Sequence, residues 1–497
     1  MSDRDTHRRM LQSTATFGGA SLLNVFVGIA RAKIVAILLG SSGIAVIGML
    51  GTALQTAALV AGMGLRTSAV RELAASHRDP ATLARVRKAL LVAHVALGLV
   101  GATTVWVLSE TLSELVFGSR AYAWEMRWVG VGVFLLLLAG ARSALLQGLR
   151  DIHALARASA IGTGVGAVLS LLAVWWLGAE GIWLYVLCTP AASALAASWL
   201  VATRVPRPAE SSSIATLAPA WRAMFLLGAA FMVTSSLPLV AKLFVQSQVA
   251  RGLGLDAAGF YQAAWTLSTH YIGFILAAMA ADFYPNLTQK AGDVAATNRL
   301  VNAQAHIGML LAGPLVLGMS ACAQYLLPAL YARDFTAAAE LLRWQVLGDL
   351  VKVAGWPIGF VLLAHADRGM FLLTQATWAA TYAIASVVGM ELWGLSGVGI
   401  AFVFACAVGF ALNCLIVGRR YGFRYERANL RSLAWLGAGG LLIVVASWTG
   451  PAPGLGAGVA LASATGMYAL VRLWPLVPEE RIARHRILRM IDGVIRR

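Results

Sequence analysis

The chain has 497 residues, of which 59% are hydrophobic and only 12% are charged, and its mean hydropathy is +0.75. Soluble domains are roughly 45–50% apolar and about 25% charged, so this composition excludes an ordinary soluble protein and indicates an integral membrane protein. The formal net charge of +17 does not indicate a nucleic-acid-binding protein, because the basic residues concentrate in short segments between apolar stretches.

The first apolar stretch follows a polar, basic N-terminus and is too long for the core of a signal peptide. We therefore predict that it remains as the first membrane helix. Apolar segments of about 19–28 residues then recur along the chain. They predict fourteen helices, at 14–39, 44–65, 89–108, 128–149, 156–177, 182–203, 223–250, 257–285, 302–325, 341–364, 369–390, 396–418, 431–449 and 455–473. Gly- or Pro-rich segments at 40–43, 178–181, 394–397 and 450–454 predict tight turns between neighbouring helices.

Lysine and arginine gather in alternate connecting segments, most densely at 66–88, at 419–431 and after residue 472. Cytoplasmic segments of membrane proteins carry such an excess of basic residues. The pattern supports the even number of helices and predicts that both termini are cytoplasmic.

The segment 205–222 is rich in serine and proline and predicts a linker. Each half then begins with an apolar helix that carries a cation and ends in a glycine-containing turn, a weak repeat that suits two lobes of the same topology. The predicted domains are an N-terminal lobe (1–204), the linker (205–222), a C-terminal lobe (223–420), two additional helices (421–475) and a basic tail (476–497). The tail suits either an amphipathic helix on the cytoplasmic leaflet or a solvated segment.

Five cations lie inside apolar stretches: Arg31, Lys33, Arg142, Lys242 and Lys352. A charge at bilayer depth costs about 2.5–3.5 kcal/mol on insertion scales and persists mainly where a cavity or a counter-ion receives it. The four cysteines have no metal-ligand spacing, so we expect no metal and no cofactor. The outer loops are short and hold no concentrated acid, base or metal ligands, which argues against an enzyme. Cations inside apolar stretches, together with the lack of an enzyme signature, favour a transporter of an anionic substrate.

Four segments resemble one known family. They are 31–75, which begins RAKIVAILLGSSG, 149–172, 253–293 and 342–364. They are similar to Wzx-type O-antigen and enterobacterial-common-antigen flippases of the multidrug/oligosaccharidyl-lipid/polysaccharide exporter (MOP) superfamily. The resemblance implies an all-α membrane protein with two lobes of six helices around a central cavity that opens alternately to the two faces. The common family pattern has twelve helices, so the last two predicted helices depart from it.

The resemblance also implies a function. Its members move undecaprenyl-pyrophosphate-linked oligosaccharides from the inner to the outer leaflet, so we expect such a lipid-linked substrate, the bacterial inner membrane as location, and glycan polymerase machinery as a candidate partner. We expect a monomer surrounded by membrane lipids, with no nucleic acid. The alternatives are a drug or metabolite exporter of the same superfamily and a membrane glycan polymerase or ligase. The first predicted helix contains cations and no carboxylate, which favours the flippase over the drug exporter.

Three cations are candidates for binding the pyrophosphate: Arg31, Lys33 and Lys242. Arg31 shares a helix face with Asn24, whereas Lys33 points about 200° away and could instead reach the headgroups. Lys242 has the corresponding position in the second half. It could equally pair with a carboxylate or with carbonyl groups inside one lobe.

Polar and aromatic residues predict a path for the sugars. Gln262, Trp265 and Thr269 fall on one face of the predicted helix 257–285. Asn24 on the first helix and Gln55 on the second are the expected partners across the cavity.

The sequence has no P-loop for ATP, so we expect ion coupling. The candidates are His270, Asp349 and Lys352. His270 could instead form a hydrogen bond between helices. Asp349 and Lys352 are three positions apart on one helix, a spacing that favours an ion pair.

Overall fold

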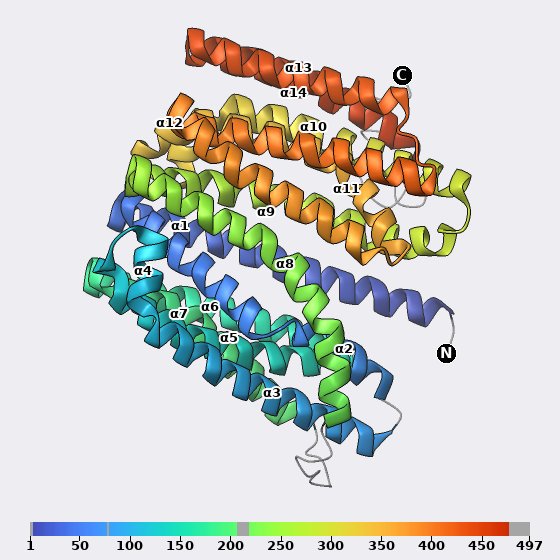
Figure 1. The fold of residues 1–497 in the computed structure, drawn as a ribbon. Helices are drawn as coiled ribbons and strands as arrows, with labels where there is room; N and C mark the ends of the chain where they lie inside the picture. The colour runs from blue at the N-terminus through green and yellow to red at the C-terminus, as the bar shows by residue number, and fades with distance from the viewer. Residues whose placement is uncertain (1–2, 77–78, 206–217, 477–497) are drawn as a thin grey trace. The chain divides into compact units, whose positions relative to one another are not determined.

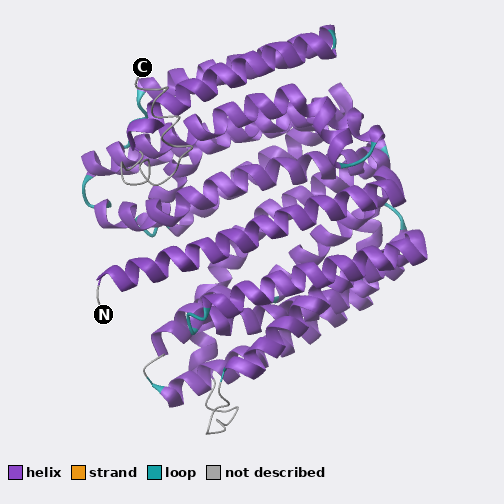
Figure 2. Cartoon of the chain, turned by 180° about the vertical axis from the view of Figure 1, so that it is seen from behind, coloured by secondary structure: helices purple, strands orange, loops and turns teal. Residues whose placement is uncertain are grey.

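The computed structural model describes residues 3–76, 79–205 and 218–476. Within these ranges its side chains are described from residue 26 onward, apart from Pro80 and a few in the helices 218–253 and 255–290. Figure 2 shows helices joined by short loops throughout this part of the chain, with no strand among the described residues. The all-α fold is as predicted. The basic tail lies outside the described residues.

Figure 1 colours the helices in chain order, from blue near the N-terminus to red near the C-terminus. They are α1 (Asp3–Ala61), α2 (Leu65–Ala75), α3 (Pro80–Val107), α4 (Ser109–Phe117), α5 (Ala123–Gly148), α6 (Ile152–Leu177), α7 (Ile182–Arg204), α8 (Ala218–Leu253), α9 (Leu255–Lys290), α10 (Val294–Leu330), α11 (Ala339–Ala364), α12 (Arg368–Tyr421), α13 (Arg427–Thr449) and α14 (Pro451–Leu473). Four 3-10 segments join some of them: η2 (Arg120–Tyr122), η3 (Gly178–Gly181), η5 (Arg333–Ala338) and η6 (Trp474–Leu476).

Two of these elements each contain a pair of helices joined by a glycine turn. In α1 the backbone turns at Gly40, with φ 69° and ψ −165°. In α12 it turns at Trp393 and Gly394, where Gly394 has φ 59°. Only glycine adopts such a positive φ without strain. The predicted turns at 40–43 and 394–397 are confirmed, and each of the fourteen predicted spans coincides with a helix.

Nine helical stretches among the described residues are long and apolar enough to cross a membrane. Three of them, Phe26–Ala61, Ile152–Arg204 and Arg368–Tyr421, each contain one of the predicted turns, at which the backbone of a glycine has a positive φ. The helices α8 and α9 form where spans were predicted but are not among the nine stretches. The chain is a multi-pass membrane protein.

The chain packs as two compact units. Unit 1 comprises Met1–Ala263 and Ala329–Phe335, and unit 2 comprises Ala264–Pro328 and Thr336–Arg497. The helix α9 passes from the first unit into the second. The predicted lobe boundary at 205–222 stays a prediction, because 206–217 lies outside the described residues.

Two short helices were not predicted. In α2, Leu65, Ala69 and Leu73 are fully buried and belong to a core that also contains Leu90 of α3 and Leu146 of α5. Their spacing of four is the sequence signal for this helix, but the basic residues around it suggested a loop. The second short helix, α4, follows α3 almost without interruption.

The two helices beyond the family pattern belong to unit 2. They pack side by side in Figure 1. The helix α13 also contacts α10 and α11, since Ile443 joins a core with Leu317 of α10 and Gly440 lies against the side chain of Leu347 of α11. The buried Asn429 donates a hydrogen bond to the carbonyl oxygen of Asn302. The helix α13 is therefore an integral part of unit 2.

Candidate functional site

Arg31 of α1 is bound by two residues of α7, within unit 1. Its Nε donates to the hydroxyl of Tyr185, and its Nη1 donates to Oγ1 of Thr189 at 2.9 Å. The guanidinium also lies over the Tyr185 ring, with Cζ 4.0 Å from the ring centroid. Tyr185 and Thr189 are four residues apart on α7 and therefore present their hydroxyls on one face.

These partners fix the direction of Arg31 without neutralising its charge. Hydroxyls and an aromatic ring stabilise a cation but carry no full negative charge. Among the described residues, Arg31 forms no ion pair with a carboxylate. A half-buried guanidinium in a membrane span is thus held in one orientation with its positive charge uncompensated.

The two other cations predicted to bind pyrophosphate, Lys33 and Lys242, have different surroundings from Arg31. Lys33 donates from Nζ to the carbonyl oxygen of Ala329 at 2.8 Å, close to the C-terminal end of α10, where cations are favoured. Lys242 of α8 is half-buried. Both lie in the same unit as Arg31. Lys33 therefore has a clear structural contact that the sequence did not indicate.

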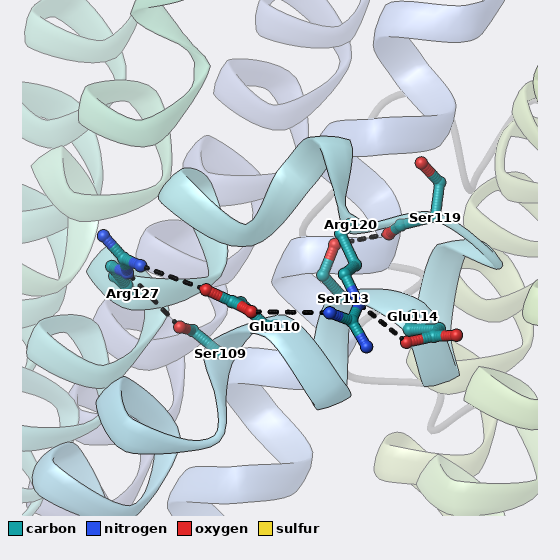
Figure 3. Close-up of polar contacts among 7 residues, drawn as sticks. All are labelled: Ser109, Glu110, Ser113, Glu114, Ser119, Arg120 and Arg127. Atoms are coloured by element: carbon teal, nitrogen blue, oxygen red, sulfur yellow. Dashed lines mark hydrogen bonds and ion pairs between the residues drawn. The ribbon is translucent and has the colours of Figure 1, made fainter.

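Arg120 of η2 and Arg127 of α5 lie close to carboxylates of α4 (Figure 3). Arg120 lies 3.0 Å from Glu114 and 3.8 Å from Glu110. Glu110 also lies 3.6 Å from Arg127. The side chains are largely exposed, so these pairs contribute little to stability. Their charges are nevertheless matched, in contrast to Arg31.

Asp349 of α11 is a buried carboxylate in unit 2, with 1% of its surface exposed. It accepts a hydrogen bond from Ser268 Oγ and another from the Tyr271 hydroxyl at 3.3 Å, both on α9. One turn earlier on α11, Gln345 is 1% exposed, and neither polar atom of its amide has a hydrogen-bond partner among the described residues. This part of unit 2 therefore holds a carboxylate, two hydroxyls and an unsatisfied amide in an apolar interior.

The predicted ion pair between Asp349 and Lys352 is wrong. It is not among the ion pairs of the described residues, and the Lys352 charge acts on the carboxylate only at longer range. Asp349 is on the buried face of α11, whereas the Lys352 side chain is exposed. His270 is also exposed, and its Nδ1 donates to the Thr266 carbonyl of the same helix at 2.6 Å, so the expected bond between helices is not formed there.

The predicted sugar-path residues have different surroundings in the structure. Gln262 accepts a hydrogen bond from Nε2 of Gln246 at 3.2 Å in unit 1. Trp265 belongs to an aromatic cluster of unit 2, with its ring centroid 6.1 Å from that of Tyr382 and 5.7 Å from that of Phe402. Gln55 and Thr269 are exposed. The side chain of Asn24 lies outside the described residues.

Sequence reasoning missed Tyr185, Thr189 and Tyr271. The signal for the first two was present, because two hydroxyl residues four apart in an apolar stretch share a face. Their partner, however, is more than 150 positions away. No local pattern indicates such a pairing.

A known protein family matches the N-terminal part of the chain. The family model described as "Polysaccharide biosynthesis protein" matches residues 10–290. The lipid III flippase of Escherichia coli (strain K12) is 21% identical over 402 residues, which cover 80% of this chain and 95% of that protein. The lipid III flippase of Shigella flexneri matches with the same identity and coverage.

Solved structures share the fold. An inward-facing multidrug resistance MATE family transporter of the MOP superfamily superposes with a TM-score of 0.70 at 16% identity, covering 82% of this chain and 98% of that one. The lipid II flippase MurJ in an inward closed conformation has a TM-score of 0.66 at 11% identity, covering 94% of this chain and all of that one. At this coverage, the second match must extend into the segment after residue 420.

The fold is thus that of MOP-superfamily transporters, as predicted. The curated relatives extend the likeness to lipid-linked oligosaccharide flippases, at distant identity. The family model covers more than half of the chain, and the chain belongs to the polysaccharide biosynthesis protein family.

Proposed function

We propose that this protein is a flippase that moves an undecaprenyl-pyrophosphate-linked oligosaccharide from the cytoplasmic to the periplasmic leaflet of the bacterial inner membrane. The oligosaccharide is the repeat unit of O-antigen or a related surface polysaccharide. Both termini are cytoplasmic in this proposal, and transport proceeds by ion-coupled alternating access. The family and the distant flippase relatives support it.

The orientation of Arg31 is the observation that carries the proposal. Its guanidinium is held by Tyr185 and Thr189, neither of which carries a negative charge. Pyrophosphate supplies that charge, and arginine binds phosphate oxygens through two parallel hydrogen bonds. A cation without a counter-ion in a membrane span is expected where an anion passes.

We assign supporting roles to the other cations of unit 1. Lys242 is the second pyrophosphate contact. Lys33 contributes less to pyrophosphate binding, since its ammonium already donates to the Ala329 carbonyl. The sugars are contacted by Asn24, Gln55, Gln262, Trp265 and Thr269.

Ion coupling is assigned to Asp349, with His270 and Lys352 as secondary candidates. A carboxylate inside a membrane protein is costly when ionised and unpaired. The hydroxyls of Ser268 and Tyr271 stabilise the ionised form by donating hydrogen bonds to it. The amide of Gln345, which has no hydrogen-bond partner among the described residues, is a further polar group one turn away. Binding and release of a proton or another small cation would therefore change the free energy of this region.

A direct test follows the lipid-linked substrate in sealed proteoliposomes. A pyrophosphate-linked glycolipid with a fluorescent sugar is placed in both leaflets, and a membrane-impermeant reagent measures its appearance on one side. We expect flipping only with the protein present and faster flipping under an imposed ion gradient. A drug-exporter function predicts the opposite result, in which cationic dyes are extruded and the glycolipid stays in its leaflet.

A further inference from the structure

An apolar groove lies on unit 1, lined by residues of α5, α6 and α7. Its volume is about 480 Å³, within the range of about 300–1,000 Å³ that is usual for ligand sites. The lining residues are apolar throughout, and α7 contributes most of them. In size and in lining, the groove therefore suits part of a hydrocarbon chain.

Small side chains of α7 and larger ones of α6 create this hollow. Ala192 and Ala196 of α7, one turn apart, are 7% and 6% exposed, so they lie at the bottom of the groove. Val165 and Leu169 of α6, also one turn apart, are 47% and 46% exposed and stand higher at its side. The groove thus opens to the surroundings of the protein, which in a membrane span are lipid.

The groove follows α7 for most of the length of the helix. Leu184 near the helix start and Trp199 near its end both line it, and at about 1.5 Å per residue they are roughly 22 Å apart. The hydrocarbon core of a bilayer is about 30 Å thick, so one leaflet accounts for about 15 Å. An ordinary phospholipid chain, confined to its own leaflet, covers only part of the groove, whereas a long polyprenyl chain covers all of it.

The start of the groove lies beside the Arg31 site. Arg31 donates hydrogen bonds to Tyr185 and Thr189 of α7. Their neighbours in the sequence, Leu184 and Cys188, line the groove. The Cys188 thiol is also within range of the Arg31 charge. The guanidinium and this end of the groove are therefore at the same level along one helix.

This arrangement matches the orientation of a lipid in the outer leaflet. The distribution of basic residues predicts that α7 starts on the periplasmic side, and Tyr185 and Thr189 are within two turns of its start. A lipid of the outer leaflet has its phosphates near that boundary and its chain directed toward the membrane centre. From the level of Arg31, the groove continues along α7 in the same direction.

The groove and Arg31 contribute different parts of the binding free energy. A hydrocarbon chain gains no hydrophobic free energy by moving from lipid into the groove, because lipid is equally apolar, so the groove contributes only packing contacts. Arg31 contributes charge-assisted hydrogen bonds to phosphate oxygens. Together they select a lipid that has both a pyrophosphate and a long chain.

We propose that the groove of α5, α6 and α7 binds the polyprenyl chain of the transported lipid while Arg31 binds its pyrophosphate on the periplasmic side. The proposal rests on the proposed function and adds to it a site for the chain. It assigns the groove to one occupant, the polyprenyl chain, and not to the acyl chains of the surrounding phospholipid.

The test uses the purified full-length chain in phosphatidylcholine vesicles. A polyprenyl pyrophosphate with a photoreactive group in its chain is irradiated, and mass spectrometry locates the labelled residues. A phosphatidylcholine with the same group in its acyl chain is the comparison. We expect the polyprenyl probe to label lining residues of α6 and α7, and unlabelled polyprenyl pyrophosphate, but not added phosphatidylcholine, to suppress this labelling.

Two results of this experiment overturn the proposal. Equal labelling of the groove by both probes means that bulk lipid fills it. No labelling of the groove by the polyprenyl probe means that the chain lies elsewhere or that protein, such as a second copy of this chain, covers the groove.

A matched pair of substitutions on α6 localises the effect. Val165→Trp fills the groove and should reduce labelling by the polyprenyl probe to the level of the phosphatidylcholine probe. Val168→Trp adds the same bulk at a residue that is 58% exposed but does not line the groove, and should leave the labelling unchanged. If Val165→Trp fails to fold, Ala191→Leu, also in the lining, takes its place. Equal labelling of wild type and a folded groove-filling variant contradicts the site.

Arg31→Ala tests whether the headgroup and the chain belong to one site. It should also reduce groove labelling to the level of the phosphatidylcholine probe, and undiminished labelling would contradict the pairing of Arg31 with the groove. Labelling requires binding and not flipping, so the two proposals fail separately. Specific labelling in a protein that does not flip the glycolipid supports the groove and contradicts the proposed function. Flipping without groove labelling does the reverse.

Discussion

Ser268 and Asp349, 81 positions apart in the chain, meet inside unit 2, where the serine hydroxyl donates a hydrogen bond to the carboxylate. The contact joins α9 to α11 at a place where only 1% of the Asp349 surface and 5% of the Ser268 surface is exposed. A buried carboxylate with neutral donors is stable enough to exist in the fold, yet its charge is not cancelled. That combination suits a residue that exchanges a cation during transport.

Asp349→Asn should uncouple transport from the ion gradient. The amide has nearly the same shape as the carboxylate but cannot bind or release a proton and holds a cation weakly. We expect downhill flipping to continue and acceleration by an imposed gradient to disappear, as measured by the proteoliposome assay. Ser268→Ala should have a smaller effect in the same direction, because one donor remains at Tyr271.

His270 provides the comparison for this prediction. Its side chain is exposed and bonded within its own helix, so His270→Gln should reduce the gradient response much less than Asp349→Asn does. Acceleration by the gradient in Asp349→Asn as large as in the wild type would mean that coupling depends on other residues.

Arg31→Ala should reduce glycolipid flipping by about tenfold or more. A hydrogen bond to a charged group contributes about 1.5–3 kcal/mol, and each 1.4 kcal/mol corresponds to a factor of ten. The reduction should be largest at low substrate concentration, which flipping rates over a concentration series would measure. Tyr185→Phe should cost only a few-fold, since it removes one neutral partner and keeps the ring below the guanidinium.

The matched control is Arg157→Gln, which removes an exposed cation from α6 of the same unit and should flip at the wild-type rate. Arg31→Lys separates charge from geometry: partial activity indicates that charge alone matters, and strong loss indicates bidentate binding. Wild-type flipping by Arg31→Ala would exclude a pyrophosphate contact at this residue.

The long apolar helices and the places of the turns between them were predictable from local sequence. Apolar length determines a membrane span, and glycine at Gly40 and Gly394 allows the positive φ that closes a hairpin. Both signals lie within a few dozen residues. Tertiary packing does not override them, because the bilayer requires each span to satisfy its own backbone hydrogen bonds.

The partners of the buried polar residues were not predictable in the same way. Local spacing paired Asp349 with Lys352, but tertiary packing turned the carboxylate toward α9 and left the lysine exposed. Lys33 met the Ala329 carbonyl, 296 positions away. Helical periodicity gives the face on which a side chain lies, whereas the neighbour on that face depends on how separate helices pack.

Gly64→Ala should strongly destabilise unit 1. Gly64 has φ 65°, and a Cβ there would lie 2.1 Å from the carbonyl oxygen of Gly228. A left-handed conformation costs a non-glycine residue about 1–3 kcal/mol before the collision with the backbone is counted. We expect a lower midpoint of thermal unfolding and a lower yield of folded protein, measured by fluorescence-detected size exclusion after heating.

Gly164→Ala is the corresponding control. Gly164 is inside α6 and has no neighbouring atom within 4 Å of the position a Cβ would take. Alanine is preferred over glycine in a helix by about 0.5–1 kcal/mol, so this variant should be as stable as wild type or slightly more so. Equal unfolding midpoints for Gly64→Ala and wild type would show that α2 and α8 do not approach as closely as described.

Asp367 connects the two ends of α12. Its side chain caps the helix start by accepting from the backbone N–H of Met370 at 3.2 Å. It also accepts from Arg420 at 2.8 Å and from the Tyr421 hydroxyl at 2.9 Å, both at the helix end. Burial raises the pKa of this carboxyl, but the hydrogen bonds from Tyr421 and Met370 and the Arg420 charge together hold the pKa below its ordinary value.

Asp367→Asn should therefore lower stability at neutral pH and change its dependence on acid. A carboxyl whose pKa is lower in the folded state stabilises the fold above its unfolded pKa of about 3.9, and that contribution is lost as pH falls through the folded value. We expect the gap between the unfolding midpoints of wild type and Asp367→Asn to be largest above pH 5 or so and to shrink toward pH 3. Asn still caps a helix through its one carbonyl oxygen, so the variant keeps the cap but loses both the charge and the oxygen that accepts from Arg420 and Tyr421. Asp151→Asn is the control, because Asp151 caps α6 at Ala154 and forms no ion pair within the described ranges. A gap for Asp367→Asn that stays constant with pH would show that the Arg420 contact contributes no charge-dependent stability.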